Sequence, residues 1–487
     1  MFGEQDVNFN QARICQWFDN IHSDAEFRAA TERAQAYIRT YFAWCIRPGG
    51  ILYHIPTENT IERVIPTNIA TYLVSTDFEY RIGGAVALKW NPQRWFMKEV
   101  TERVVLTFDP TESRTFERRG QAYINLWRGY LHDSVTTTFD EYPLEVQRAV
   151  MGILDHIKQV WCSGDATQAR YVERWLAQVA QKLKCTTLLF GTSGQGWGKS
   201  IITDFLWEYV FGRESTIVCE DADSLVGDFN SLLKSKTLVV VEEAPAASRA
   251  QWSRFYDKLK QAITGKTLTL KEKYQSSMTV DNYTCWMMFS NNQALRLDAD
   301  DRRVVFLEMS DARKGDHAYF RDLMSHMTSE TGEAFFQYLR GIDLEAFDDQ
   351  RDRPITRAKT EHIADHLPSV IQFVKDTYVL RNVGIEGPFG TLYDRYEQWS
   401  REHDRKPLGK NLFSRTMKTE LGLKTTRRRV AGCPCVCADM GHADLLRMYQ
   451  GRRWVTEMDD IELPDEVLED APAVLPPATG IPAVLLP

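Results

Sequence analysis

Four glycines, a lysine and two serines lie in the segment 191–200, GTSGQGWGKS. A phosphate-binding loop needs small residues so that backbone N–H groups can close on the anion, a lysine for the outer phosphates and a hydroxyl for Mg2+. A register that starts at Gly191 puts Trp197 where the lysine should stand, whereas one anchored on Lys199 puts Ser193 in place of the first glycine. The second register meets every requirement and predicts these nucleotide-binding residues: Ser193, Gly194, Gly196, Trp197, Gly198, Lys199 and Ser200.

A pair of acids follows a second apolar run, TLVVVEEA, further along the chain. Nucleotide hydrolysis needs a carboxylate near the metal and the attacking water. We expect Glu242 to bind Mg2+ together with Ser200, and Glu243 to orient or deprotonate water. A glutamate pair at a strand end is otherwise often a solvated terminus, but the apolar residues before this pair favour the catalytic interpretation.

An amide and two arginines follow later apolar runs. Asn291 is the first asparagine of MMFSNN, where it could reach the γ-phosphate or hold the water. Arg302 and Arg303 precede VVFLEM, and an arginine there could stabilise transition-state charge in a neighbouring subunit's site. For either arginine alone, an ion pair with a neighbouring aspartate is an equally good interpretation. The order of loop, acids, amide and arginines is what favours catalysis.

The elements that must position these residues are strands alternating with helices. CTTLLF before the loop is a short apolar run, and KSIITDFLWEYVFG after it has helical apolar spacing that ends at Gly212. Further apolar runs carry the acids and the amide. This alternation predicts an α/β fold with a parallel sheet that binds its ligand at the carboxyl ends of the strands.

The flanking regions have different patterns. Residues 9–46 are rich in helix formers, whereas 50–90 alternate apolar and polar residues, so we expect an α+β N-terminal region. The segments GTLYDRYEQWSREHD, GKNLFSRTMKTELG and TTRRRVAG predict helix, helix and strand, as in a helix-turn-helix with a wing. The acidic, Pro-rich C-terminal tail has no periodicity, and we expect it to be disordered.

The net charge of −8 is concentrated in that tail, which carries eight acids and no base over 454–487. By contrast, 401–454 carry thirteen Lys or Arg against five Asp or Glu. Such local excess of positive charge favours a nucleic-acid partner over a merely solvated face. No apolar run approaches the roughly 20 residues that span a bilayer, and the N-terminus lacks a signal-peptide pattern, so we expect no membrane contact and a cytoplasmic location.

Most of the nine cysteines are isolated, which suits reduced, packed thiols. Cys433, Cys435 and Cys437 cluster, and His442 follows them. They could supply metal ligands, but C-x-C-x-C lacks the C-x-x-C spacing of structural zinc sites, so zinc is the less favoured alternative.

Taken together, LLFGTSGQGWGKS, LVVVEEA, the segment 263–292 and DRRVVFLEM resemble the superfamily 3 helicase domain of phage and plasmid primase-helicases. The resemblance covers 165–310, and the following basic segment looks like the winged-helix domain of that family. It implies an AAA+ P-loop NTPase core that uses ATP and Mg2+, assembles as a ring, expected to be a homo-hexamer, and moves along single-stranded DNA.

Carried over to this chain, the resemblance makes Lys199 and Ser200 the Walker A pair, Glu242 and Glu243 the Walker B acids, and Asn291 the sensor. Arg303 is the preferred arginine finger because it directly precedes the apolar run, and Arg302 is second.

In the same family, a hairpin between the acidic and amide strands touches DNA, and KTLTLKEKYQSS matches that place. Lysines on such a hairpin would contact phosphates and the tyrosine could stack on a base. An exposed lysine is otherwise usually only solubilising. With the basic strand of the winged helix included, the predicted DNA-binding residues are Lys266, Lys271, Lys273, Tyr274, Arg427, Arg428 and Arg429.

Two departures from the family stand out. Ser193 replaces the usual first glycine, which weakens nucleotide affinity without excluding hydrolysis. Larger members carry a primase domain with two alternating acids, for which Asp77 and Glu79 in TDFEY are the nearest match. The region before the helicase is short for such a domain, so we expect no primase activity.

The expected organisation is therefore an α+β region over 1–160, an ATPase domain over 165–345, a linker over 346–365, a winged-helix domain over 366–456 and a tail over 457–487. The favoured function is an ATP-dependent replicative DNA helicase of a phage, plasmid or other mobile element. It would act on single-stranded DNA and replication forks, with replication-initiation or primase proteins as possible partners. The alternatives are a DNA-remodelling or packaging ATPase and a nucleotide-regulated origin-binding protein; the paired acids argue against the latter.

Overall fold

The computed structural model describes residues 8–58, 60–100, 102–194, 196–219, 223–227, 229–242, 249–290, 302–357, 359, 367–430, 433–456 and 459–461. The chain divides into two compact units. The first comprises 1–295 and 302–356, and the second comprises 357–487 with 296–301. None of the helices within the described ranges is long and apolar enough to cross a bilayer.

The centre of the first unit is a parallel sheet of five strands. Its order is β10 (Thr216–Cys219), β11 (Leu238–Val241), β14 (Cys285–Ser290), β9 (Leu188–Thr192) and β15 (Val304–Leu307), and every neighbouring pair is parallel. All residues of β11, β14 and β15 are buried. Such continuous apolar strands are typical of a parallel sheet covered on both faces. The predicted α/β fold with a parallel sheet is confirmed.

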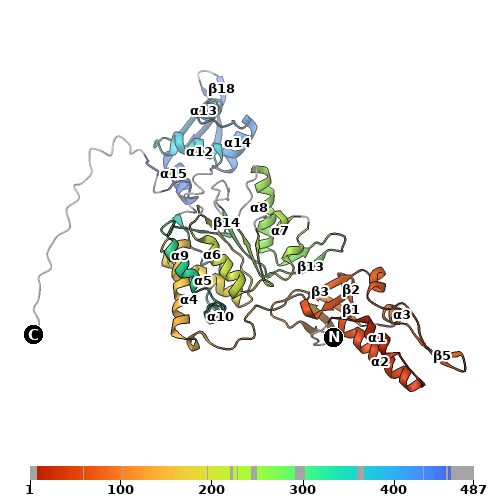
Figure 1. Ribbon diagram of the computed structural model, residues 1–487. Coiled ribbons are helices and arrows are strands. Elements are labelled where there is room, and N and C mark those ends of the chain that lie inside the picture. Colours follow the sequence, from red (N-terminus) through yellow and green to blue (C-terminus); the bar gives the residue numbers. More distant parts are fainter. Residues whose placement is uncertain are drawn as a thin grey trace, which may run out of the picture. The chain divides into compact units, whose positions relative to one another are not determined.

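Helices cover this sheet on both sides (Figure 1). One group contains α4 (Leu144–His156), α5 (Ala166–Ala180), α6 (Lys199–Phe205), α9 (His317–Ser325) and α10 (Ser329–Arg340), and α10 packs on α4 and α5. The other contains α7 (Asp223–Val226) and α8 (Arg249–Thr264). The strands β12 (Thr267–Leu270) and β13 (Met278–Asp281) form an antiparallel hairpin between α8 and β14.

The N-terminal region contains a six-stranded mixed sheet. Its order is β3 (Thr60–Val64), β2 (Gly50–Ile55), β1 (Phe42–Arg47), β6 (Arg103–Thr107), β8 (Gln121–Asn125) and β7 (Thr115–Arg118). Its other elements are α1 (Gln11–Trp17), α2 (Asp24–Tyr41), α3 (Pro92–Lys98) and the hairpin of β4 (Phe78–Ile82) and β5 (Ala85–Trp90). The helical pattern expected over 9–46 ends at Tyr41, because the next residues pair with β2 and β6.

The segment after α10 packs on the unit that contains the parallel sheet, although we expected a linker from residue 346. Asp349 is buried and accepts hydrogen bonds from the Thr186 hydroxyl at 2.7 Å and the Thr187 hydroxyl at 2.9 Å. The Tyr171 hydroxyl donates to the Asp349 carbonyl oxygen at 2.7 Å. The sequence did not predict this attachment because the segment is rich in charge and one buried carboxylate holds it.

The second unit contains α12 (Ser369–Val374), β16 (Ile385–Pro388), α13 (Phe389–Glu402), α14 (Lys410–Thr419), β17 (Lys424–Val430), β18 (Cys433–Met440) and α15 (His442–Gly451). Its three strands form an antiparallel sheet in the order β16, β18, β17. Phe373, Tyr396 and Phe413 lie at the centre of its core. The predicted helix, helix and strand correspond to α13, α14 and β17.

Candidate nucleotide-binding site

The glycine loop leaves the carboxyl edge of β9 and ends at the first turn of α6. The Ser193 N–H donates to the Ser290 carbonyl oxygen at 3.1 Å, which fixes the start of the loop beside the end of β14. Gly196 and Gly198 have φ of +77° and +94°, a backbone conformation that other residues adopt at a cost. Backbone geometry therefore requires glycine at these two positions.

The loop is also tightly enclosed. A Cβ at Gly198 would lie 2.6 Å from Phe320 Cε1 and 3.2 Å from His156 Cε1, and a Cβ at Gly194 would lie 2.7 Å from Trp197 Nε1. The Ser193 hydroxyl and the Trp197 indole N–H are buried without a hydrogen-bond partner among the described residues. Because buried polar atoms normally have partners, these two fit a site that is completed by an acceptor-rich ligand such as a nucleotide.

The acid predicted to hold Mg2+ lies next to the loop. Glu242 directly follows β11, and its backbone N–H donates to the Cys219 carbonyl oxygen at 3.0 Å. Lys199 Nζ lies 3.5 Å from the Glu242 carbonyl oxygen. The parallel sheet thus brings Lys199, Ser200 and Glu242, predicted from separate motifs, to one edge.

Thr203, one helical turn after Ser200, was missed by sequence reasoning. Its hydroxyl lies 2.9 Å from Glu242 Oε1 and 2.9 Å from the Ser200 carbonyl oxygen, and it has one proton to donate. A hydrogen bond from Thr203 to the Glu242 carboxylate would hold that carboxylate beside the glycine loop. Partial burial, followed by the neighbouring Glu242 carboxylate, raises the pKa of Asp204 on the same helix.

His156 was also missed, because it lies at the end of α4, far from the loop in sequence. Its Nδ1 lies 2.9 Å from the Tyr319 hydroxyl, and its Nε2 lies 3.4 Å from the Gly198 carbonyl oxygen. The ring is fully buried, and this burial lowers the pKa of His156. A neutral imidazole therefore contacts Gly198, the residue before Lys199.

The arginines predicted as fingers lie at the opposite edge of the sheet from the loop of their own chain. Leu188, the first residue of β9, donates its N–H to the Arg303 carbonyl oxygen at 2.6 Å. The loop begins beyond the other end of β9, roughly 13 Å away at 3.3 Å per strand residue. Arg302 and Arg303 are therefore not brought to their own loop. Glu243 and Asn291 lie outside the described residues.

The predicted DNA-contacting hairpin is present, but its candidates separate into two groups. Lys271, Lys273 and Tyr274 lie in the turn that joins β12 to β13, where Tyr274 is 85% exposed and Lys273 Nζ lies 5.2 Å from the centre of its ring. Lys266 precedes β12 at the other end of the hairpin. Asn230 fixes the turn, accepting from the Lys271 N–H at 2.8 Å and donating to the Thr269 carbonyl oxygen at 3.0 Å.

The basic strand of the second unit is β17, and Arg427, Arg428 and Arg429 are all exposed on it. Arg428 pairs with Asp439 of β18 at 3.2 Å, and both side chains are more than half exposed, so this pair contributes little to stability. Alternation along the strand places Arg427 and Arg429 together on the other face.

No group of three or more metal-ligating side chains occurs in the described ranges. Cys437 is buried, Cys435 is partly exposed, and His442 Nε2 lies 3.0 Å from the Val379 carbonyl oxygen. The side chain of Cys433 lies outside the described part of the chain.

Asp77 and Glu79, the nearest match to primase acids, are both held by basic side chains. Asp77 pairs with Lys89 at 2.7 Å, and Glu79 with Arg81 at 2.6 Å. Hydrogen bonds from these cations lower the pKa of both carboxyls.

Comparison with known proteins relates the chain to a phage replication protein. Residues 191–303 match a family of unknown function (DUF5906), and this span runs from the glycine loop to Arg303. The chain is 24% identical over 289 residues to the DNA primase-polymerase of Nitratiruptor phage NrS-1, covering 58% of this chain and 38% of that protein. Most of the phage protein thus lies outside the match.

The fold is shared with the C-terminal region of the NrS-1 protein. An apo structure of residues 305–718 of that protein matches with a TM-score of 0.56 and 20% identity, over 82% of this chain and 96% of the other. A second apo form matches with a TM-score of 0.56 and 17% identity over the same shares. At this identity the likeness concerns the fold alone.

Proposed function

We propose that this chain is an ATP-driven motor that moves along single-stranded DNA and serves as a replicative helicase of a phage or related mobile element. The observation that carries the proposal is the meeting of Lys199, Thr203 and Glu242 at the carboxyl edge of a parallel sheet whose central strand β14 lies between the loop strand and the acid strand. Similarity to a phage primase-polymerase supports a role in replication.

The loop residues fit ATP. Backbone N–H groups of 194–199 would surround the phosphates, Lys199 would neutralise their charge, and the Ser193 hydroxyl would gain the partner it lacks in the described chain. Ser200 and Glu242 would hold Mg2+, which supplies charge neutralisation at the β- and γ-phosphates. Glu243 and Asn291 follow β11 and β14 in sequence, and we retain them as the water-orienting acid and the sensor amide.

The position of Arg303 supports assembly as an AAA+ ring. It precedes β15 at the sheet edge away from its own loop, so an arginine finger at this position must act on a neighbouring subunit. A ring of six subunits is the form we propose. Arg302 remains the second candidate.

We propose two DNA contacts. The hairpin turn would grip the strand without sequence preference, because Lys271 and Lys273 supply charge and the exposed Tyr274 ring supplies a stacking surface. The second unit has the element order of a winged helix, and Arg427 and Arg429 on β17 would contact phosphates.

Hydrolysis of ATP with and without single-stranded DNA tests this function. The parent protein should hydrolyse ATP and be stimulated by DNA, whereas Lys199→Ala should lose turnover because the outer phosphates lose their point charge. Turnover by Lys199→Ala at the parent rate would refute the loop assignment. Lys271→Ala with Lys273→Ala should retain basal hydrolysis but lose the stimulation, and stimulation at the parent level would refute the hairpin contact.

A further inference from the structure

A polar groove separates the N-terminal sheet from the ATPase core within the first unit. Its volume is about 640 Å³, and it is lined by β3, by the loops before β7, β10 and β11, and by the hairpin turn. It lies apart from the glycine loop, because none of the described residues in 193–200 contributes to its wall. Cavities of this size accommodate small ligands or a short stretch of a chain.

Five basic side chains line this groove: Arg63, Arg114, Arg128, Lys234 and Lys236. Two of them have carboxylate partners, since Arg128 pairs with Glu214 and Lys234 with Glu272. Arg63 bonds to the Ser276 carbonyl oxygen at 2.9 Å, and Lys236 bonds to the Glu214 carbonyl oxygen at 3.0 Å. Arg114 also donates to a carbonyl oxygen, that of Asn125, at 2.8 Å. A carbonyl dipole orients a cation but does not neutralise its charge.

The bases of the groove repel one another. Burial, together with the neighbouring Arg128, lowers the pKa of Arg114 to about 10. Burial also lowers the pKa of Lys236; the Glu214 carboxylate opposes this shift, and Arg128 adds to it. Arg114 remains charged near neutral pH, so an anion in the groove would relieve its repulsion by Arg128.

Polar atoms without partners also collect along this wall. Thr60 Oγ1, Arg63 Nε and Gln275 Oε1 are all buried, and none has a hydrogen-bond partner in the described ranges. A hydroxyl and a guanidinium N–H are donors, and the Gln275 amide can present its NH2 after a flip. The groove thus shares a feature with the glycine loop: both contain buried hydrogen-bond donors that a ligand with acceptor atoms would satisfy.

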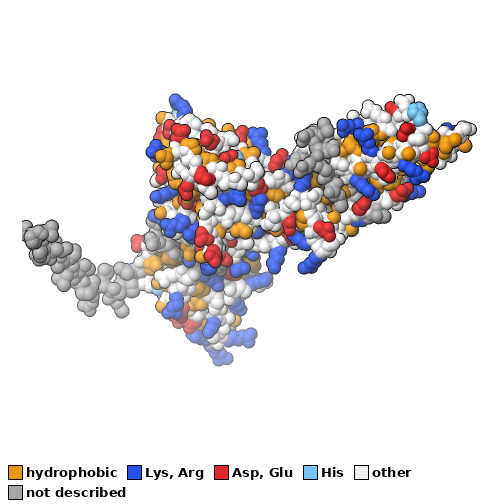
Figure 2. Space-filling view, turned by 90° about the horizontal axis from the view of Figure 1, so that it is seen from below, with side chains coloured by type: hydrophobic (Ala, Val, Ile, Leu, Met, Phe, Trp, Pro, Cys, Tyr) orange, Lys and Arg blue, Asp and Glu red, His pale blue; other side chains and the backbone are white. Residues whose placement is uncertain are grey.

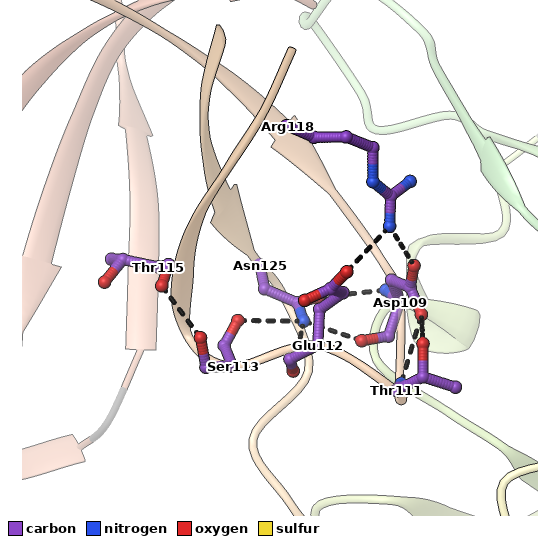
Figure 3. Close-up of polar contacts among 7 residues, drawn as sticks. All are labelled: Asp109, Thr111, Glu112, Ser113, Thr115, Arg118 and Asn125. Atoms are coloured by element: carbon purple, nitrogen blue, oxygen red, sulfur yellow. Dashed lines mark hydrogen bonds and ion pairs between the residues drawn. The ribbon is translucent and has the colours of Figure 1, made fainter. Parts of the chain in front are cut away.

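A network of hydrogen bonds holds the loop before β7, which carries Arg114 (Figure 3). Asn125 is fully buried, its Oδ1 accepts from the Asp109 N–H at 3.0 Å, and its Nδ2 donates to the carbonyl oxygens of Asp109 at 2.7 Å and Glu112 at 3.0 Å. Its backbone N–H also bonds to the Arg114 carbonyl oxygen at 2.8 Å. Asp109 is in turn held by Arg118 at 3.2 Å. Side chains fixed in this way bind a ligand with little loss of entropy.

We propose that this groove binds the phosphodiester backbone of single-stranded nucleic acid beside the hairpin turn. This inference rests on the proposed function and extends it, because Glu272 and Gln275 of the same turn form part of the wall. None of the described lining residues is aromatic, so the groove suits phosphates rather than stacked bases. Of the four lining acids, Glu214 and Glu272 are paired with bases, while Glu58 and Glu62 are exposed.

The distribution of charge over the surface does not reveal this groove. On the face seen in Figure 2, Lys and Arg side chains are interspersed with Asp and Glu. The local arrangement of cations and unsatisfied donors is what distinguishes the groove.

The test measures binding of a fluorescent oligo-dT strand by anisotropy over a range of salt concentrations, without nucleotide. Loss of one phosphate contact should reduce the slope of log K against log[salt] by about 0.7, which is about fivefold in affinity at 0.1 M salt relative to 1 M. Arg63→Gln should show this loss. Arg63→Lys should keep the parent slope, because the charge remains. Arg28→Gln, an exposed basic residue of α2 outside the groove, is the matched control and should behave as the parent does.

An unchanged slope in Arg63→Gln, with the parent binding the strand, would overturn the groove and leave the proposed function standing. An equal loss in Arg63→Lys would also overturn it, because Arg63 would then act only through its bond to Ser276. Failure of the parent to bind any strand would contradict both claims. A free nucleotide is the other source of phosphate. If Lys199→Ala still binds labelled ATP, and adding Arg63→Gln to that variant removes this binding, the groove is a nucleotide site. That result would overturn the proposal that the groove binds single-stranded nucleic acid.

Discussion

Alanine at two glycines of the loop separates the cost of backbone conformation from the cost of crowding. Gly196 has φ +77° and no atom of the described residues within 4 Å of the position that a Cβ would take, whereas Gly198 has φ +94° and its Cβ would meet Phe320 at 2.6 Å. An L-residue in the left-handed region costs about 1–2 kcal/mol. Crowding at a packed site adds about 1–3 kcal/mol. Gly198→Ala should therefore be the more damaging change.

The strain should be observed as lost nucleotide affinity, because alanine shifts the free loop toward shapes that cannot close on phosphates. At about 1.4 kcal/mol per tenfold, Gly196→Ala should weaken binding roughly 5- to 30-fold and Gly198→Ala roughly 30-fold or more. Isothermal titration with a non-hydrolysable ATP analogue and Mg2+ measures both, and a thermal melt checks that each variant is folded.

A second substitution sharpens this comparison. Phe320→Ala removes the ring that a Cβ at Gly198 would meet, so it should restore part of the affinity of Gly198→Ala and none of that of Gly196→Ala. Equal affinities for the two single variants would show that the contacts at Gly198 do not constrain the loop. Parent-level affinity in both would refute the conformation of the loop itself.

Three further predictions concern the surroundings of the loop. Thr203→Val should lower the turnover number of ATP hydrolysis about 10- to 100-fold, since a hydrogen bond to a charged group contributes about 1.5–3 kcal/mol; Thr203→Ser, which keeps the hydroxyl, should stay near the parent, and equal losses would exclude the bond to Glu242. Burial lowers the pKa of His156 in the folded state, so as the pH decreases through the unfolded value of 6.5 the unfolded chain binds the proton preferentially. The folded state therefore becomes less stable as the pH decreases. His156→Gln should flatten the fall in Tm between about pH 7 and 5.5 measured by scanning fluorimetry, and an unaltered slope would count against a buried neutral imidazole. Arg303→Ala and Lys199→Ala should each be inactive alone but regain up to about a quarter of parent turnover when mixed equally, because one interface in four of a random ring is intact; no recovery at any ratio would argue against action in trans.

The parts of the site that sequence could predict are those with local signals. Lys199 and Ser200 follow a glycine-rich turn, and Glu242 ends an apolar run. Because parallel strands present their carboxyl ends at one edge, these motifs could be expected to meet, and the structure brings them together.

Two residues of the site, Thr203 and His156, were missed for different reasons. Thr203 lies three residues after Ser200, so helical spacing offered a signal that reasoning from motifs did not use. His156 carries none, because its contact with Gly198 depends on how α4 packs on α6. The strand β1 could not be predicted for the same reason. It pairs with β6, about sixty residues away, and this pairing makes it a strand although the helical pattern before it continues into its sequence.

The polar groove could not be predicted from any local pattern in the sequence. Its wall joins residues of β3, the Asp109–Arg114 loop and the hairpin turn, and no short segment of sequence carries the pattern. Only the fold reveals that Arg63 and Gln275 lie on the same cavity.

The central claim is that nucleotide hydrolysis at the loop drives movement on DNA. Strand separation of a forked DNA labelled on one strand, with either a 3′ or a 5′ single-stranded tail, tests it most directly. The account predicts that the parent protein separates one of these forks with ATP, and that Lys199→Ala or a non-hydrolysable analogue abolishes separation. Hydrolysis by the parent with no separation of either fork, or separation by Lys199→Ala, would contradict it.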